Sequence, residues 1–143
     1  MSNVLGRQGF SSGVVSWAVR VIAQFNEMRI GFTNNPQQTR NWRGYSLSNP
    51  HAWLYSDGSR QSGAHNNGKL IKSGVGFGPS DVIGIVLDFT AKEYSFFKNG
   101  QHIMTLPRLP QGVLYPMVAM DAQYDTVEVF YWYPGMDEKF VPK

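Results

Sequence analysis

Apolar and polar side chains alternate with a two-residue repeat along several parts of the chain. The clearest stretch covers residues 14–22, and its apolar positions are Val15, Trp17, Val19 and Val21. Two further stretches repeat the pattern, with apolar positions Met28, Ile30 and Phe32 in the first and Val127, Val129 and Tyr131 in the second. This repeat is typical of a β-strand that buries one face. Each stretch therefore predicts a half-buried strand.

Residues 82–89 are the most apolar part of the chain, and they are rich in β-branched side chains without a clean alternation. That composition predicts a central strand covered on both sides. Asn99-Gly100 stands between two strand-like runs and predicts a tight type I′ hairpin, because both residues tolerate the positive φ angles of that turn. Further turn signals recur at short intervals and no sustained helical stripe is present, so we predict an all-β fold, an antiparallel sandwich or barrel.

The composition excludes several classes of protein. The chain has 143 residues, of which 42% are apolar and 16% charged, and this predicts one globular domain over residues 1–143. The absence of cysteine excludes disulfides and thiolate sites and leaves the redox compartment open. No apolar run approaches the roughly 18 residues of a membrane span, and no secretory signal pattern is visible. We therefore expect an intracellular protein, cytoplasmic or nuclear, with no membrane partner.

Groups that could carry out chemistry do not converge in the sequence. His51, His65 and His102 lack metal-ligand spacing, and no serine stands in a Gly-x-Ser-x-Gly motif. Asp81 and Asp88, on or beside the apolar strand, are interpreted as caps of a turn or a strand end. We predict no catalytic residue, no metal and no cofactor, and hence no enzyme.

Charge is distributed unevenly. The net charge is +3, but residues 1–80 hold eight Lys and Arg against two Asp and Glu, whereas residues 81–143 hold five against eight. Either the charges mix on the surface of one domain, or a basic patch favours an acidic partner. Arg40-Asn41-Trp42-Arg43 interleaves guanidinium groups and a ring, which suits nucleic acid and equally suits a protein interface.

An ordered set of motifs resembles the SPRY domain, the core of B30.2 domains. The motifs are Gly9-Phe10-Ser11-Ser12-Gly13, Trp17-Ala18-Val19, Arg29-Ile30-Gly31-Phe32, Tyr55-Ser56-Asp57-Gly58, Asp81-Val82-Ile83-Gly84, Ser95-Phe96-Phe97-Lys98-Asn99-Gly100 and Leu114-Tyr115-Pro116. The resemblance covers a core of about residues 4–132 and leaves a short tail, residues 133–143. It implies a bent sandwich of two antiparallel sheets that recognises a partner protein through loops at one end, without catalysis. No preceding PRY segment is evident.

The resemblance also implies where a partner would bind. SPRY adaptors that carry a SOCS box grip a short extended peptide with a tyrosine that matches Tyr55, together with loops that match residues 23–27 and 121–125. Large rings in predicted loops have no periodic reason to be buried. We therefore expect one concave partner-binding surface made by Gln24, Phe25, Asn26, Asn34, Arg40, Trp42, Arg43, Tyr55, Asp121, Gln123 and Tyr124. For Trp42 and Tyr55, packing beneath the loops is the alternative.

Three functions from different classes remain open. The first is a non-catalytic module that binds a partner protein or short peptide as a recruiting or scaffolding subunit. The second is a carbohydrate-binding module of lectin type, because exposed Trp and Tyr stack on sugars. The third is an RNA-associated accessory protein that uses the basic N-terminal half, although nucleic acid is not the favoured partner.

Overall fold

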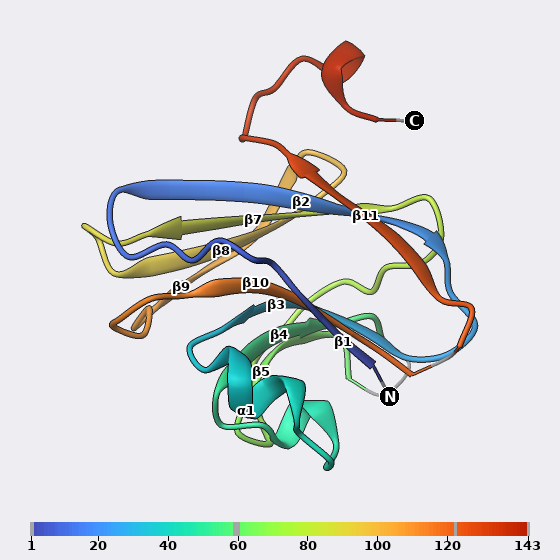
Figure 1. Cartoon of the computed structure of the whole chain (residues 1–143). Coiled ribbons are helices and arrows are strands. Elements are labelled where there is room, and N and C mark those ends of the chain that lie inside the picture. Colours follow the sequence, from blue (N-terminus) through green and yellow to red (C-terminus); the bar gives the residue numbers. More distant parts are fainter. Residues whose placement is uncertain (1, 59–60, 122, 143) are drawn as a thin grey trace.

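The computed structural model describes residues 2–58, 61–121 and 123–142, which fold into two antiparallel sheets packed face to face (Figure 1). The six-stranded sheet has the order β1-β10-β3-β4-β5-β6. Its strands are β1 (Ser2–Leu5), β3 (Met28–Thr33), β4 (Ala52–Ser56), β5 (Gly63–Asn66), β6 (Lys69–Ser73) and β10 (Tyr115–Met120). The predicted all-β sandwich is confirmed.

The five-stranded sheet has the order β11-β2-β7-β8-β9. Its strands are β2 (Val14–Ala23), β7 (Val82–Asp88), β8 (Glu93–Lys98), β9 (Gln101–Pro107) and β11 (Thr126–Tyr131). The apolar strand β7 lies at the centre of this sheet, as predicted. The hairpin between β8 and β9 is also confirmed, since Asn99 and Gly100 have φ angles of 51° and 82°.

The core lies between the two sheets and is rich in aromatic rings. On β2, Trp17, Val19 and Val21 point inward and are at most 5% exposed. Phe32 of β3 meets Tyr94 of β8 edge to face, with ring centroids 5.3 Å apart. Such contacts between rings add to the hydrophobic stabilisation from their burial.

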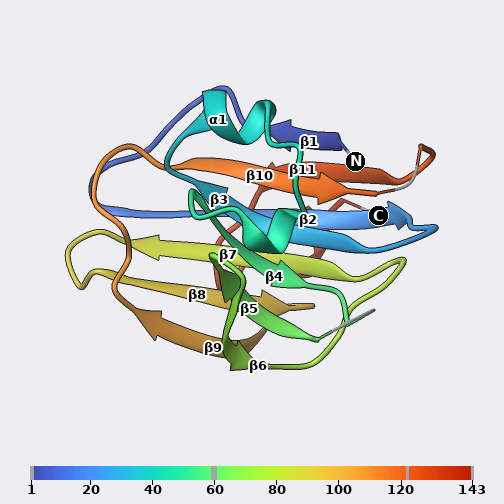
Figure 2. The same cartoon turned by 90° about the horizontal axis from the view of Figure 1, so that it is seen from below.

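The connection between β3 and β4 covers the outer face of the six-stranded sheet (Figure 2). It contains α1 (Pro36–Arg40) and the short 3₁₀ helix η1 (Ser46–Ser48). Leu47 from this connection packs with Ala52, Leu54, Met117 and Ala119 in a second apolar cluster. All six residues of β3 are buried as a result. The prediction that β3 is half-buried is therefore wrong, because its polar face lies under this covering segment.

Strand β11 departs from prediction in the opposite sense. Its apolar positions alternate as expected, yet Val129 is 50% and Tyr131 is 74% exposed. Val129 pairs with the inward-facing Val19, but β11 is the edge strand of its sheet, and Val129 lines a hollow together with residues of β1 and β10. The prediction that this face is buried is confirmed for Val127, which packs against the main core, and is wrong for Val129 and Tyr131.

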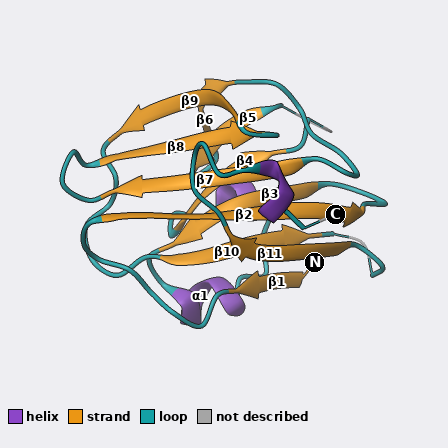
Figure 3. Ribbon diagram, turned by 90° about the horizontal axis from the view of Figure 1, so that it is seen from above, coloured by secondary structure: helices purple, strands orange, loops and turns teal. Residues whose placement is uncertain are grey.

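The tail after β11 crosses the outer face of the five-stranded sheet, as Figure 3 shows. It contains the short 3₁₀ helix η2 (Glu138–Phe140). Trp132 anchors this tail, since its ring packs edge to face on Phe97 with centroids 5.3 Å apart and lies directly over Gly84. A Cβ at Gly84 would overlap the indole ring. The glycine therefore provides the space that the ring occupies.

Candidate partner-binding surface

The connection between β2 and β3 and the connection between β10 and β11 lie side by side at one end of the sandwich (Figures 1 and 2). The backbone N–H of Phe25 donates to Oδ1 of Asp125 at 2.7 Å. The N–H of Asp121 donates to the carbonyl of Glu27 at 3.3 Å. We call this end the rim and define it as residues 24–27, 121 and 123–125. Its two halves are joined although about one hundred residues separate them in the sequence.

The connection that follows β4 also contacts the rim and holds it in place. Asp57, which follows β4, donates its backbone N–H to the carbonyl of Met28 at 3.1 Å, and its carboxylate accepts from the Met28 N–H at 3.2 Å. The same carboxylate accepts a hydrogen bond from the side-chain amide of Gln24. Asp57 is only 7% exposed, so it positions the rim and presents little surface to a partner.

Two large rings project from the rim. Phe25 and Tyr124 are each 70% exposed, and Asn26 and Gln123 beside them are exposed as well. A ring held away from the core on a loop whose backbone is fixed has apolar area that only another molecule can cover.

Arg29 connects the rim to the segment that covers the six-stranded sheet. Its side chain is fully buried, and its guanidinium group forms ion pairs with the carboxylates of Glu27 and Asp121. It also donates to Oγ of Ser46 at 2.8 Å and lies 4.4 Å from the centre of the Tyr45 ring. A buried cation requires this number of partners, because burial without them is costly. Arg29 therefore fixes the rim against the covering segment.

The structure contradicts the expectation that Tyr55 contacts a partner. In the register of the sheet, Tyr55 pairs with Ile30 and Ala64, which both face the inter-sheet core, and it is 0% exposed. Its ring packs on Phe96, and its hydroxyl group donates to the carbonyl of Val75. Burial raises the pKa of the hydroxyl group to about 12. Tyr55 is a core residue beneath the loops.

The remaining predicted residues do not share one concave surface with the rim. Asn34 follows β3 at the end away from residues 24–27, about 17 Å along the strand at the usual rise per residue. Arg40, Trp42 and Arg43 lie on the covering segment, outside the six-stranded sheet. The expected single surface is therefore wrong. The rim and the covering segment are separate surfaces, and partner binding by each stays a prediction.

Sequence reasoning missed the residues that hold the rim in place. Glu27, Arg29, Asp57 and Asp125 form its framework. One signal was present in the sequence: an arginine stands in an alternating strand, two residues after a glutamate. Buried charges are rare unless they are paired, so this pair marked a network.

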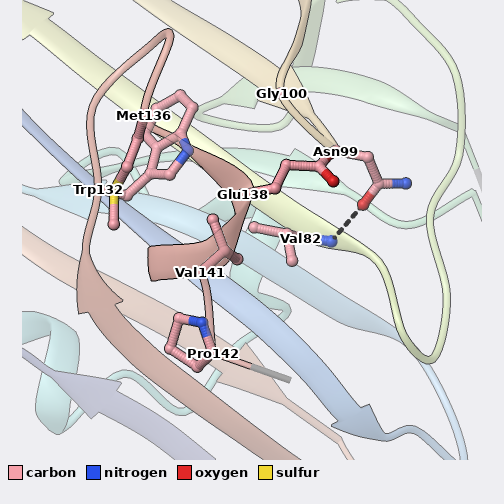
Figure 4. Close-up of a pocket in the computed structure, with 8 residues that line it drawn as sticks. All are labelled: Val82, Asn99, Gly100, Trp132, Met136, Glu138, Val141 and Pro142. Atoms are coloured by element: carbon pink, nitrogen blue, oxygen red, sulfur yellow. Dashed lines mark hydrogen bonds between the residues drawn. The ribbon is translucent and has the colours of Figure 1, made fainter.

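A separate hollow of about 200 Å³ lies beneath the tail, between Trp132, Met136, Val141 and the β8–β9 turn (Figure 4). In the turn, Oδ1 of Asn99 accepts from the Val82 N–H at 2.8 Å.

Within the described residues, no group of three or more His, Cys, Asp or Glu side chains could hold a metal ion. The part of the chain that the structure describes also contains no helix long and apolar enough to cross a membrane.

Comparison with known proteins supports the fold. The model of the SPRY domain family matches residues 14–131. The chain is also similar to the ATP-dependent RNA helicase Ddx1 of Drosophila melanogaster, with 35% identity over 81 residues. That match spans 54% of this chain and 11% of the helicase.

Two solved structures share the fold. The SPRY domain of human HERC1 superposes with a TM-score of 0.76 at 21% identity and covers 90% of this chain and 81% of that one. The TRIM65 PSpry domain superposes with a TM-score of 0.70 at 19% identity and covers 93% of this chain and 72% of that one.

Proposed function

The chain belongs to the SPRY domain family, and on that premise we propose that it is a non-catalytic module that binds a partner protein or short peptide through the rim. SPRY domains are generally protein–protein interaction modules. In this chain, the bound segment would contact Phe25 and Tyr124 first. Recruitment of that partner to a larger assembly is the role we assign to the module, and we place it inside the cell, in the cytoplasm or the nucleus.

The observation that carries the proposal is the pair of exposed rings on two joined loops. Phe25 and Tyr124 are each 70% exposed, whereas the backbone of Phe25 is held by Asp125 and that of Asp121 by Glu27. Binding energy at protein interfaces is concentrated in a few large side chains. A loop that is already ordered also loses less conformational entropy on binding. The rim combines both properties.

The carboxylates of the rim have a positioning role in this proposal. Asp125 and Asp57 accept backbone N–H groups, and Glu27 and Asp121 face the buried Arg29. The groups available for partner contact are therefore the two rings and the polar side chains of Asn26 and Gln123, since the Gln24 amide already donates to Asp57 and to the carbonyl of Asn26. This set favours a partner segment with apolar side chains and a free main chain that the amides can bond.

The test is quantitative partner capture with the double variant Phe25→Ala/Tyr124→Ala. We expect its specific partners to be depleted at least about tenfold, since the loss of two interface rings costs more than 1.4 kcal/mol. The matched control is Phe140→Ala/Tyr131→Ala, because these rings are 63% and 74% exposed and lie outside the rim. The control should keep the partners of the wild type.

The proposal fails if the rim variant and the control retain the same partners while both remain folded. It also fails if the only ligands captured are glycans that bind the rim variant as well as the wild type. Thermal unfolding of both variants keeps the comparison valid, since exposed side chains contribute little to stability.

A further inference from the structure

Acidic residues are distributed unevenly between the two layers of the molecule. No strand of the six-stranded sheet contains Asp or Glu, and neither does the entire connection of residues 34–51 that covers it. In contrast, the five-stranded sheet carries Asp88, Glu93 and Glu128. The strands of this sheet and the covering segment therefore supply no carboxylate of their own. Glu27 and Asp121, which flank β3 and β10 at the rim, are paired with the buried Arg29.

Exposed cations occupy this layer. Arg40 and Arg43 on the covering segment and Lys69 and Lys72 on β6 are all exposed. Within the described residues, none of the four forms an ion pair, unlike Arg20, which pairs with Glu128 on the other sheet. Exposed cations without local partners attract anions from solution over about one Debye length, roughly 8 Å at physiological salt.

A hollow of about 440 Å³ lies on the covering segment, in the same stretch of chain as Arg40 and Arg43. It is lined by Asn35, Gln37, Gln38, Asn41 and Trp42. The Asn35 side chain accepts from the Gln38 N–H at 3.0 Å and so fixes the first turn of α1. Gln37, Gln38 and Asn41 are exposed. Each side-chain amide offers both a donor and an acceptor, which are the groups needed to read the edge of a base.

Trp42 is held in place at the wall of the hollow. Its indole N–H donates to the carbonyl of Tyr45 at 3.0 Å, and its backbone N–H donates to the carbonyl of Thr39 at 3.2 Å. Gly44 lies against the indole edge, where an added Cβ would approach Nε1 to 3.3 Å. The ring is half-buried and keeps one part accessible from the hollow. A ring whose orientation is fixed in this way is a stacking platform with little entropy left to lose.

We propose that this surface, the hollow with Trp42, Arg40 and Arg43, binds single-stranded RNA. A base stacks on Trp42, the amides of the hollow bond its edge, and the two guanidinium groups that flank Trp42 in the chain contact neighbouring phosphates. A neutral saccharide would leave both arginines without a role. An acidic peptide would use the arginines but not a flat ring beside a wall of amides. The site is separate from the rim, so the inference stands independently of the proposed function.

The experiment measures binding of a fluorescein-labelled single-stranded RNA of about 12 nucleotides by fluorescence anisotropy. Trp42→Ala should weaken binding by a factor of about 5 to 150, which corresponds to the loss of one stacked base at 1 to 3 kcal/mol. Trp42→Phe should recover much of the loss, because it restores a ring. Thermal unfolding of both variants shows whether the covering segment is intact.

The two arginines are tested through salt dependence. Two phosphate contacts to a single strand predict that a rise from about 50 mM to about 200 mM salt weakens binding about sevenfold. Arg40→Gln/Arg43→Gln should remove most of this dependence. The control Lys92→Gln/Arg108→Gln removes two exposed charges outside the six-stranded layer and should leave the dependence unchanged, as should the rim variant.

Three results would overturn the inference. One is an affinity that Trp42→Ala leaves unchanged while the protein is folded. Another is equal affinity for duplex RNA, or equal loss in the control, since either shows non-specific attraction by charge alone. The third is selective binding of a neutral glycan that Trp42→Ala abolishes, because it would assign the hollow to saccharide.

Discussion

The backbone N–H of Phe25 and the carboxylate of Asp125 are joined by a hydrogen bond of 2.7 Å between two connections at the same end of the sandwich. Asp125 is 9% exposed, so this bond is largely shielded from water. The donor is the backbone N–H of Phe25, whose ring is exposed. The bond therefore fixes the backbone from which the ring projects and leaves the ring itself accessible. The geometry of the rim therefore depends on a residue that has almost no surface of its own.

The first prediction concerns this bond. Asp125→Ala removes the acceptor and leaves a backbone N–H without its partner, which should lower the free energy of unfolding by about 1 to 3 kcal/mol. Hydrogen exchange at the Phe25 amide should accelerate more than exchange in the core strands. Asp125→Asn keeps an oxygen in place and should lose less. Unchanged exchange at Phe25 in the alanine variant would contradict the role given to Asp125.

The second prediction concerns Arg29. Arg29→Ala leaves the carboxylates of Glu27 and Asp121 without their buried partner and vacates the space under Tyr45. We expect the free energy of unfolding to fall by about 3 to 5 kcal/mol in urea denaturation. Arg29→Lys should recover only part of the lost free energy of unfolding, because an ammonium group does not reproduce the planar, forked donors of a guanidinium group.

The control for Arg29 is the half-exposed pair of Arg20 and Glu128, which is 3.2 Å long. Arg20→Ala should cost no more than about 1 kcal/mol, since solvent screens such pairs. Equal losses for the two arginines would mean that the buried network contributes nothing beyond a surface ion pair.

Most of the fold could be predicted from the sequence because its determinants are local. The alternation of Trp17, Val19 and Val21, the apolar run of β7 and the Asn99-Gly100 turn each depend on neighbours in the chain. Burial of strand faces was harder to predict. Arg29 and Thr33 are buried because residues 34–51 fold over them, and Val129 is exposed because β11 lies at an edge. Such burial depends on strand order, which alternation does not encode.

The candidate site divides in the same way. Phe25 and Tyr124 were found because large rings in loops lack a periodic reason for burial, and both are exposed. The family resemblance implies a surface position for Tyr55, yet Tyr55 stands at an inward position of β4, opposite Ile30 and Ala64. The sequence predicts one surface for Trp42 and the rim residues, because residue spacing does not reveal the path of the connection between β3 and β4.

The third prediction concerns the anchor of the tail. Gly84→Ala places a methyl group where the Trp132 ring lies, and the ring has to move. We expect destabilisation by about 1 to 3 kcal/mol from overpacking and a change in tryptophan fluorescence as Trp132 becomes hydrated. In the background of Trp132→Leu, Gly84→Ala should cost much less. A cost that is the same in both backgrounds would show that the strain arises elsewhere.

The fourth prediction concerns alkaline pH. Burial raises the pKa of both Tyr55 and Tyr94 from 10.0 to about 12 in the folded protein. The unfolded chain therefore releases these two protons at lower pH than the folded chain. The stability due to this difference is fully present below pH 10 and is lost as the pH rises from 10 to 12. Urea denaturation across this range should show a falling midpoint, and absorbance of tyrosinate should reveal a late-titrating fraction.

Replacement by phenylalanine distinguishes the titration of these two tyrosines from all other effects of alkaline pH on stability. Tyr55→Phe/Tyr94→Phe retains both rings in the core but removes the groups that titrate, so the decline in stability above pH 10 should become shallower. The loss of the Tyr55 hydrogen bond to Val75 lowers stability at every pH by about 1 kcal/mol and does not alter the slope. Tyr131→Phe, at a site that is 74% exposed, should leave the slope unchanged. If both variants decline as steeply as the wild type, burial of the two hydroxyl groups is not the cause of the alkaline loss.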